Sequence, residues 1–180
     1  MNQNICYGAI IILFIFVSCS TAEQTVQQPE EPEIPAESEN KVPDWFNESR
    51  AGYVENNQIY SFGIASAANE DEARKLAIRQ SDANLRAQVD YLFEEARIEL
   101  VENNESDADT PDFIRTLRNT IQKIDLSNAD IQIETRKTDT DAVFAYVLKT
   151  LTKNKVINNV RIQMQEHKNI DLLLNTEVLN

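Results

Sequence analysis

The sequence has little cysteine, histidine or glycine, and each shortage argues against a class of site. Of 180 residues, two are Cys, one is His and three are Gly. Both Cys6 and Cys19 lie near the N-terminus, so the rest of the chain offers neither a disulfide nor the thiolates of a structural zinc site. His167 is alone, and only Gly52 and Gly63 follow the N-terminal region. We therefore expect no metal, no cofactor and no glycine-rich phosphate loop, and we do not expect an enzyme.

Positive charge is also scarce. The chain has 17 Lys and Arg against 30 Asp and Glu, which gives a formal net charge of -13. Such a chain has no electrostatic basis for gripping nucleic acid or an anionic lipid surface over a broad face. We therefore expect no nucleic-acid partner. The same charge favours solubility and opposes non-specific self-association.

One uncharged hydrophobic run stands at the N-terminus. Residues 5–19 end in Val17-Ser18-Cys19, followed by Ser20. At about 15 residues, the run suits a secretory signal and is shorter than the roughly 20 residues of a membrane span. The small residues around Cys19 resemble a bacterial lipobox, in which the cysteine is acylated and begins the mature protein. We predict a lipoprotein signal peptide at 1–18 and lipidation of Cys19; an ordinary secretory signal or a short membrane anchor are the alternatives.

Lipidation would place the protein in the bacterial cell envelope, held to a membrane by its N-terminal lipid. Because Ser20 is not acidic, we expect the outer membrane, although the sorting rule differs between bacterial lineages. Residues 20–42 are rich in Gln, Glu and Pro and poor in bulky apolar groups. Such a segment cannot bury enough surface to offset its ordering entropy. We predict that 19–42 is the acylated cysteine plus a disordered tether.

Residues 43–180 are predicted to form a single α+β domain. Residues 59–65 alternate bulky and small side chains, which predicts a strand with one bulky and one small face. Gly63, on the small face, suggests that another backbone approaches closely. Residues 131–136 and 143–148 read as two further strands, the second apolar on both faces. Together they predict a small antiparallel sheet covered by helices.

A long helix is expected after the first strand. Asn69 suits the N-cap, and Glu72, three residues later, can complete a variant of the capping box. Neither Pro nor Gly occurs from there to residue 103. The first half of this helix carries small residues that can lie close to a sheet, and Asp82 and Arg86 form an i,i+4 pair on its outside. The second half carries a bulkier apolar stripe. That stripe needs cover, either from the helix at 111–124 or from a second subunit in a homo-oligomer.

Two more helices complete the expected domain. Thr110 and Pro111 are a good cap and first turn for a helix with an apolar face over 113–124. A final helix at about 153–173 places apolar residues along one side. The sheet would then be covered by the long helix and this C-terminal helix, with an extra helical insertion at 102–124.

Five aromatic residues cluster near the start of the domain: Trp45, Phe46, Tyr53, Tyr60 and Phe62. They could line a small apolar pocket in a ligand-binding module. Such a group more often closes the core where the chain enters a domain. Both readings stay open, and these five are the binding residues that the sequence predicts.

Other chemistry is weakly supported. Ser81 and His167 could belong to a hydrolase, but Ser81 lies in the middle of a predicted helix with no strand-to-helix elbow, so a surface serine and a solvated histidine are the simpler interpretation. The carboxylates of Glu94, Glu95, Glu99 and Glu102 could bind calcium, but a solvated helix face is the simpler interpretation. The acidic loop 102–109 is a slightly better calcium candidate, although it lacks the turn glycine of a calcium loop.

Several of these motifs, in this order, resemble the Lpp-twenty family of bacterial lipoproteins. They are the Pro43-Asp44-Trp45-Phe46 opening, the Tyr-Gly strand within 59–67, the Ala- and Arg-rich helix at 73–87 and the strand 145–148. The likeness covers roughly 43–160, with 102–124 as an insertion. It implies a dodecin-like layer of sheet and helix and no catalytic residues.

The resemblance also implies a role in the cell envelope, since some relatives are surface antigens and others are parts of flagellar outer-membrane structures. We expect a non-catalytic structural or assembly role through contacts with other envelope proteins. The alternative is a periplasmic binding module for a small apolar or peptide ligand.

Overall fold

The computed structural model describes residues 42–103 and 108–180. The predicted signal peptide, the lipidation residue Cys19 and the tether up to residue 41 lie outside the described residues. Of the helices that the structure describes, none combines the length and apolarity of a membrane span.

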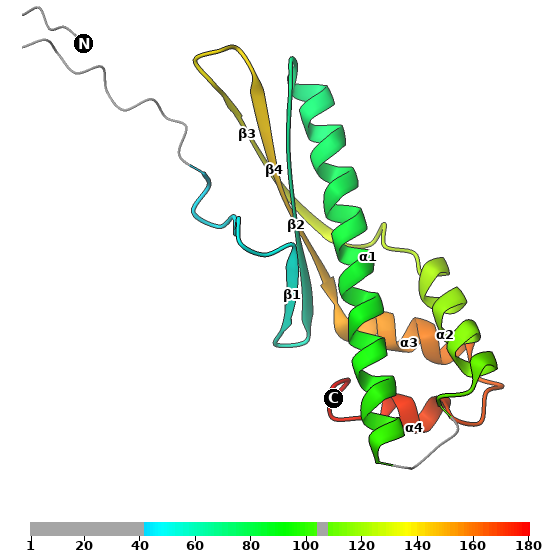
Figure 1. Cartoon of the computed structure of the whole chain (residues 1–180). Coiled ribbons are helices and arrows are strands. Elements are labelled where there is room, and N and C mark those ends of the chain that lie inside the picture. The colour runs from blue at the N-terminus through cyan, green and yellow to red at the C-terminus, as the bar shows by residue number, and fades with distance from the viewer. Residues whose placement is uncertain (1–41, 104–107) are drawn as a thin grey trace, which may run out of the picture. The chain divides into compact units, whose positions relative to one another are not determined.

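Four antiparallel strands form one sheet in the order β1-β2-β4-β3 (Figure 1). They are β1 (Gly52–Glu55), β2 (Gln58–Ala67), β3 (Asp130–Lys137) and β4 (Val143–Thr152). The two central strands pair along their full lengths, from Gln58 opposite Thr152 to Ala67 opposite Val143. The predicted small antiparallel sheet and the α+β class are confirmed.

The sequence analysis missed the short strand β1. The two residues that follow β1, Asn56 and Asn57, both have positive φ, 46° and 62°. Two consecutive residues with positive φ make the two-residue turn whose twist suits a hairpin. Tyr53 therefore pairs with Tyr60 across that hairpin.

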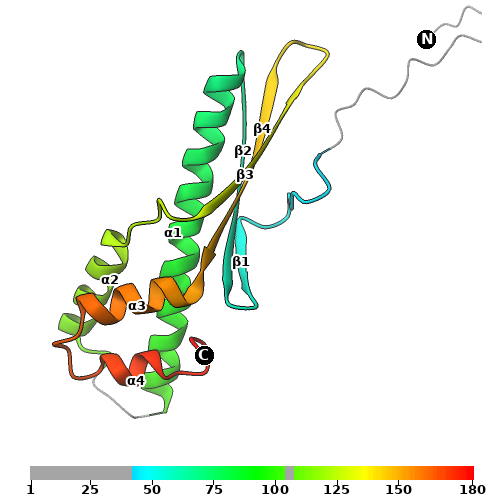
Figure 2. The ribbon, with the colours of Figure 1, turned by 180° about the vertical axis from the view of Figure 1, so that it is seen from behind.

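The helix α1 (Glu70–Glu102) is 33 residues long and runs far beyond the sheet. Its N-cap is as predicted, because the Asn69 side chain accepts from the Glu72 N–H at 2.9 Å. At 1.5 Å per residue the helix spans about 50 Å. Figures 1 and 2 show one half of α1 against the sheet and the other half against the remaining helices.

The first half of α1 lies close to the sheet because the facing residues are small. Ala73, Ala77 and Ser81 are fully buried and spaced one turn apart. A Cβ placed on Gly63 of β2 would lie 2.1 Å from the Ala77 carbonyl oxygen. The close backbone approach that Gly63 suggested is therefore present, and the crossing helix is α1.

The second half of α1 packs against α2 (Pro111–Lys123) and α4 (Ile170–Leu174), and α3 (Lys153–Gln163) packs in turn against α2 and α4. These helices supply the cover that the bulky stripe of α1 needs within the same chain. The largest fully buried side chains of this core include Phe93, Leu100, Phe113, Leu117, Ile121 and Leu173. As predicted, α2 begins at a Thr110 cap whose hydroxyl accepts from the Phe113 N–H.

The prediction of one C-terminal helix at 153–173 is wrong. The chain leaves the helix at Met164, turns through 165–169 and begins the short α4 at Ile170. Residues 165–169 carry no large aliphatic side chain, so a continued helix would gain little burial there. The break instead lets both Met164 and Leu173 enter the same core.

The predicted Asp82–Arg86 pair on the outside of α1 is also wrong. Asp82 contacts the amine of Lys149 from β4. Arg86 instead donates to the carbonyl oxygens of Ile121 and Gln122, each at 3.0 Å, at the end of α2. Both side chains therefore hold other elements to α1.

Candidate functional site

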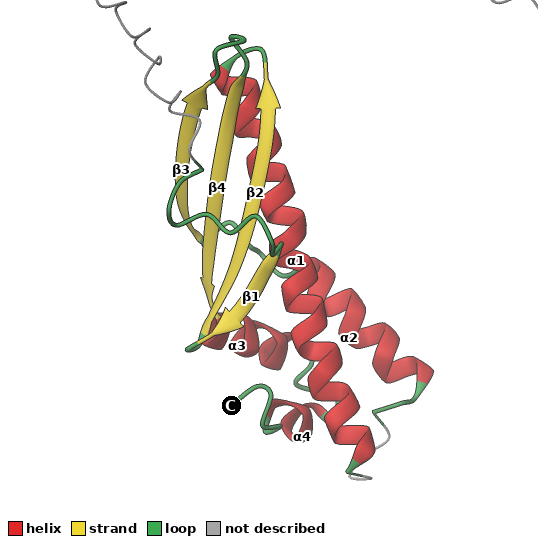
Figure 3. Cartoon of the chain, turned by 60° about the vertical axis from the view of Figure 1, so that its left-hand side comes forward, coloured by secondary structure: helices red, strands yellow, loops and turns green. Residues whose placement is uncertain are grey.

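The sheet has an inner face under α1 and an outer face turned the opposite way. Because side chains alternate along strands, the even-numbered residues of β2 and β4 lie on the outer face. Within the described part of the chain, this outer face has no helix over it; the irregular segment 43–51 crosses it on the way to β1 (Figure 3). The outer face is the surface on which the predicted binding residues meet.

Phe46 is the centre of the aromatic cluster. Its ring centroid lies 5.5 Å from that of Phe62 and 5.1 Å from that of Tyr146, both in edge-on geometry. Trp45 lies edge-on to Phe46 at 5.9 Å. Edge-on pairs place the positive rim of one ring against the negative face of the other. These contacts fix the entering segment across the middle of the sheet.

The hairpin adds the remaining predicted residues. The rings of Tyr53 and Tyr60 stack at 4.6 Å, and Tyr53 lies 6.1 Å from Phe62. All five predicted aromatic residues therefore belong to one connected cluster. Phe62 is buried, whereas Tyr53 and Tyr60 remain half-exposed at its rim.

Trp45 is hydrogen-bonded to Glu134 of β3, which also pairs with Arg136. The Trp45 indole N–H donates to the Glu134 carboxylate at 3.2 Å, and Arg136 donates to the same carboxylate at 2.6 Å. The hydrogen bond from Arg136, followed by that from Trp45, holds the pKa of Glu134 below its usual value. Glu134 therefore presents a carboxylate that orients both side chains at neutral pH.

The sequence analysis did not assign four outer-face residues to the cluster. Phe144 and Tyr146 come from β4, and Glu134 and Arg136 come from β3. Because all four have even numbers within two predicted strands, the sequence placed each pair on one face of its strand. It could not show that this face carries the aromatic cluster before the strand order and the position of residues 43–51 were known.

A cavity of about 410 Å³ opens beside this cluster, at the edge of β2. It lies between the entering segment, β2 and α1. Its apolar wall comes from Phe46, Phe62 and Ile64. Its polar wall is formed by Asn47, Glu48, Ser49, Arg50, Gln80 and Asn84. Two of the five predicted residues, Phe46 and Phe62, line this cavity.

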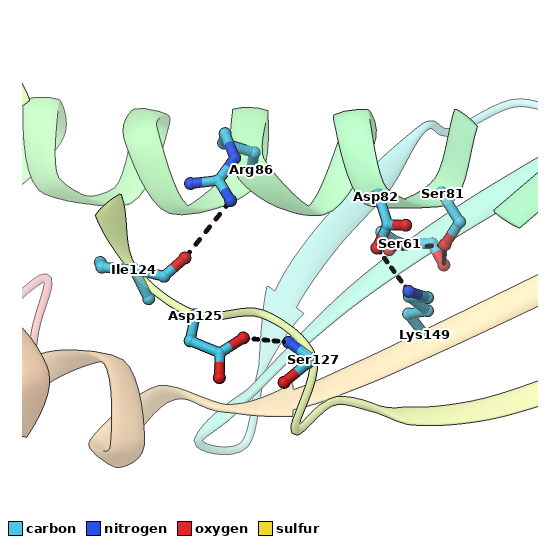
Figure 4. A network of polar contacts seen from close by, with 8 residues as sticks. All are labelled: Ser61, Ser81, Asp82, Arg86, Ile124, Asp125, Ser127 and Lys149. Carbon is cyan, nitrogen blue, oxygen red and sulfur yellow. Dashed lines mark hydrogen bonds and ion pairs between the residues drawn. The ribbon is translucent and has the colours of Figure 1, made fainter. Parts of the chain in front are cut away.

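The inner face carries a polar network instead (Figure 4). The hydroxyls of Ser61 and Ser81 lie 3.0 Å apart and are fully buried. The Lys149 amine, which is mostly buried, contacts the Asp82 carboxylate. Each of these polar groups has a protein partner, which is what burial requires. The network ties α1 to the sheet.

The structure does not bring Ser81 and His167 together. Ser81 contacts β2, while His167 lies edge-on to Phe113 at 5.3 Å and 3.9 Å from the Asp112 carboxylate, both on α2. The prediction that Ser81 is a surface serine is wrong, because the small residues of α1 press it against β2. His167 is half-buried.

The acidic side of α1 is not simply solvated. Glu94 pairs with Arg97 at 2.7 Å, and the Glu99 carboxylate accepts the backbone N–H groups of Glu177 and Val178 at 2.9 Å and 3.2 Å. Residues 104–107 of the acidic loop lie outside the described residues. Among the residues that are described, no three acidic, Cys or His side chains gather into a metal-binding group.

The outer face offers aromatic surface, and the amide side chains of Asn47, Gln80 and Asn84 line the cavity. No family model, no curated protein and no solved structure matches the chain.

Proposed function

We propose that this chain is a lipid-anchored protein of the bacterial cell envelope that acts through protein–protein contacts, without catalysis, at the outer membrane. The observation that carries the contact role is the aromatic outer face. Aromatic residues are enriched where proteins bind one another, and a half-exposed cluster of them is a suitable anchor. The hydrophobic run ending at Cys19 supports the lipid anchor.

The anchor and the tether are compatible with such a role. A segment of about 23 residues can reach tens of ångströms as a flexible chain. The domain could then contact partners at some distance from the membrane. The net charge of -13 on the whole chain opposes its contact with anionic lipid headgroups.

Metabolic labelling tests the anchor. Cells that express the full chain are fed an alkyne fatty acid, and the wild type is compared with Cys19→Ala. We expect label on the wild type and none on the variant. Equal labelling of the two proteins would contradict lipidation at Cys19.

Site-directed photo-crosslinking tests the contact face. A photoreactive phenylalanine analogue replaces Tyr60 at the rim of the outer face or, as the control, Ile162 of α3, which is 68% exposed. We expect discrete adducts with envelope proteins from position 60 only. The same adducts from both positions, or none from position 60, would contradict the outer face as the contact surface.

A second candidate function is a periplasmic binding module for a small apolar or peptide ligand. The cavity of about 410 Å³ beside Phe46 and Phe62 favours it, because ligand sites are concave and largely apolar with a few polar groups. Native mass spectrometry of the purified chain tests it. A bound small molecule that is lost in Phe62→Ala would favour this candidate over the contact role.

A further inference from the structure

The edge of β2 is covered by β1 over only part of its length. β1 pairs with residues 58–61, while β2 continues to Ala67. The last main-chain bond along this line runs from the Phe62 N–H to the Ala51 carbonyl at 2.9 Å. In the described residues, no strand pairs with 63–67 on this side. We call residues 63–67 the open edge.

Backbone alternation decides which groups face the open edge. In an antiparallel sheet, successive residues direct their N–H and C=O groups to opposite neighbours. Phe62 bonds to Ala51 on the β1 side, so Ile64 and Ser66 face the same side. The next strand of this sheet would meet the main-chain groups of these two residues.

Two side-chain amides of α1 lie where an added strand would pair with the open edge. Asn84 donates to the Phe62 carbonyl at 2.7 Å, and the Gln80 side-chain carbonyl accepts from the Ile64 N–H at 2.8 Å. A carboxamide carries the same kinds of donor and acceptor as a peptide group. The main chain of β2 at this edge is therefore already bonded to amide groups that resemble a peptide. Gln80 is exposed, so water competes for its bond and it can be displaced at small cost.

Apolar surface lies on both sides of the open edge. On the outer side, the cavity exposes Phe46 and Ile64. On the helix side, Leu76 is 39% exposed and lies one turn before Gln80 on the same flank of α1. An added strand places alternate side chains on opposite sides, so both apolar surfaces would be covered.

The negative charge of the chain favours a positively charged segment at the open edge. Glu72 lies four residues before Leu76 on the flank of α1 that borders the open edge, and the whole chain carries a net charge of -13. Glu48 and Arg50 in the cavity wall offset each other. A second copy would bring the same excess of negative charge, which opposes pairing, whereas a cationic segment is attracted.

We propose that the open edge binds an extended, positively charged segment of a partner protein as an added strand, with the Gln80 side chain displaced. The identification of the partner as an envelope protein rests on the proposed function; the peptide-binding edge itself does not.

The test measures binding of a defined probe to the purified full chain. The probe is a fluorescein-labelled peptide, Lys-Val-Thr-Val-Thr-Val-Lys, and its control has proline in place of the central valine. Fluorescence anisotropy gives the Kd. We expect the first peptide to bind and the proline peptide to bind at least tenfold more weakly, because proline cannot donate to the edge.

Variants of the chain locate the binding. Ser66→Pro removes an edge-facing N–H without breaking the β2–β4 ladder, and we expect at least a tenfold loss of affinity. Ile131→Pro makes the matching change on the opposite edge, β3, and should leave the Kd unchanged. Gln80→Ala removes the competing amide and should tighten binding roughly fivefold. Thermal melts check that each variant is folded.

Three results would overturn the proposal. The first is no binding of the probe by either the wild type or Gln80→Ala. The second is equal affinity in the wild type and a folded Ser66→Pro variant. The third is a wild-type dimer in sedimentation velocity that Ser66→Pro dissociates, which would give the edge to a second copy. Failure of lipid labelling at Cys19 leaves this measurement unaffected, so the two proposals fail separately.

Discussion

Among single residues, Gly63 sets the distance between α1 and the sheet. An added methyl group would lie 2.1 Å from the Ala77 carbonyl and 2.7 Å from the Ser81 backbone nitrogen. Both are backbone atoms, which cannot rotate away as a flexible side chain can. The close approach of the helix therefore depends on the absence of a Cβ at this position.

We expect Gly63→Ala to lower the free energy of unfolding by at least about 2 kcal/mol, because α1 must shift away from β2. Urea unfolding of the two proteins measures this. Ser66→Ala, an exposed change on the same strand, is the control and should stay within about 0.5 kcal/mol of the wild type. Equal stability of Gly63→Ala and the wild type would show that the helix does not need this contact.

The ion pair of Glu94 makes the stability of the fold depend on pH. The hydrogen bond from Arg97 holds the pKa of Glu94 below its usual 4.5. Because the folded carboxyl is the stronger acid, the pair stabilises the fold above about pH 4.5 and loses this effect as pH falls through the lowered pKa.

We therefore expect Glu94→Gln to be less stable than the wild type at pH 7, and the difference to shrink at pH 3. Urea unfolding at the two pH values measures it. Glu102→Gln, at an exposed carboxylate of the same helix, should match the wild type at both. A Glu94→Gln deficit that is the same at pH 3 as at pH 7 would rule out the ion pair as its cause.

At the scale of elements, α2 is attached to α1 through its C-terminal end as well as through its apolar face. Arg86 donates to the carbonyls of Ile121 and Gln122 at 3.0 Å and of Ile124 at 3.3 Å. The last carbonyls of a helix lack intrahelical donors, and a cation there also suits the helix dipole.

We expect Arg86→Met to cost about 1–3 kcal/mol and to speed amide exchange at the end of α2. Hydrogen exchange with mass spectrometry over 117–124, together with urea unfolding, measures both effects. Arg115→Met removes an exposed pair with Asp112 on the same helix and is the control, with little change expected. Unchanged exchange over 117–124 in Arg86→Met would show that α2 does not depend on this cap.

The elements also show how far sequence patterns reach. The caps at Asn69 and Thr110 and the alternation of 59–65 are local features, so the sequence predicted them. Asp82 and Arg86 bind residues far along the chain, so the i,i+4 spacing predicted the wrong pair. The helix break at Met164 was not predicted for the same reason, since it depends on a core that several helices share.

At the scale of the whole molecule, α1 joins two hydrophobic clusters. One lies in the helical half around Phe93; the other lies under the sheet around Ala77 and Val147. Since one continuous helix belongs to both, loss of either cluster removes part of the support of the other. We infer that residues 42–180 unfold as one cooperative unit.

Phe93→Ala tests this coupling. It empties a fully buried site in the helical half and should cost about 3–5 kcal/mol. Trp45, the single tryptophan, reports on the outer sheet face by fluorescence, while circular dichroism at 222 nm reports mainly on the helices. We expect both midpoints in urea to fall together. A shift in circular dichroism with an unchanged Trp45 transition would show two independent halves.

The sequence by itself determined the α+β class, the long capped helix, the strand with one small face, and the five aromatic residues, because these follow from periodicity and capping within short stretches of chain. It also supplied the prediction of lipidation at Cys19, which lies outside the described residues. Only the tertiary structure decided the strand order, the joining of Glu134 and Tyr146 to the aromatic cluster, and the open edge of β2. Those features depend on contacts between residues far apart in the chain, where burial and backbone pairing, rather than local pattern, select the partner.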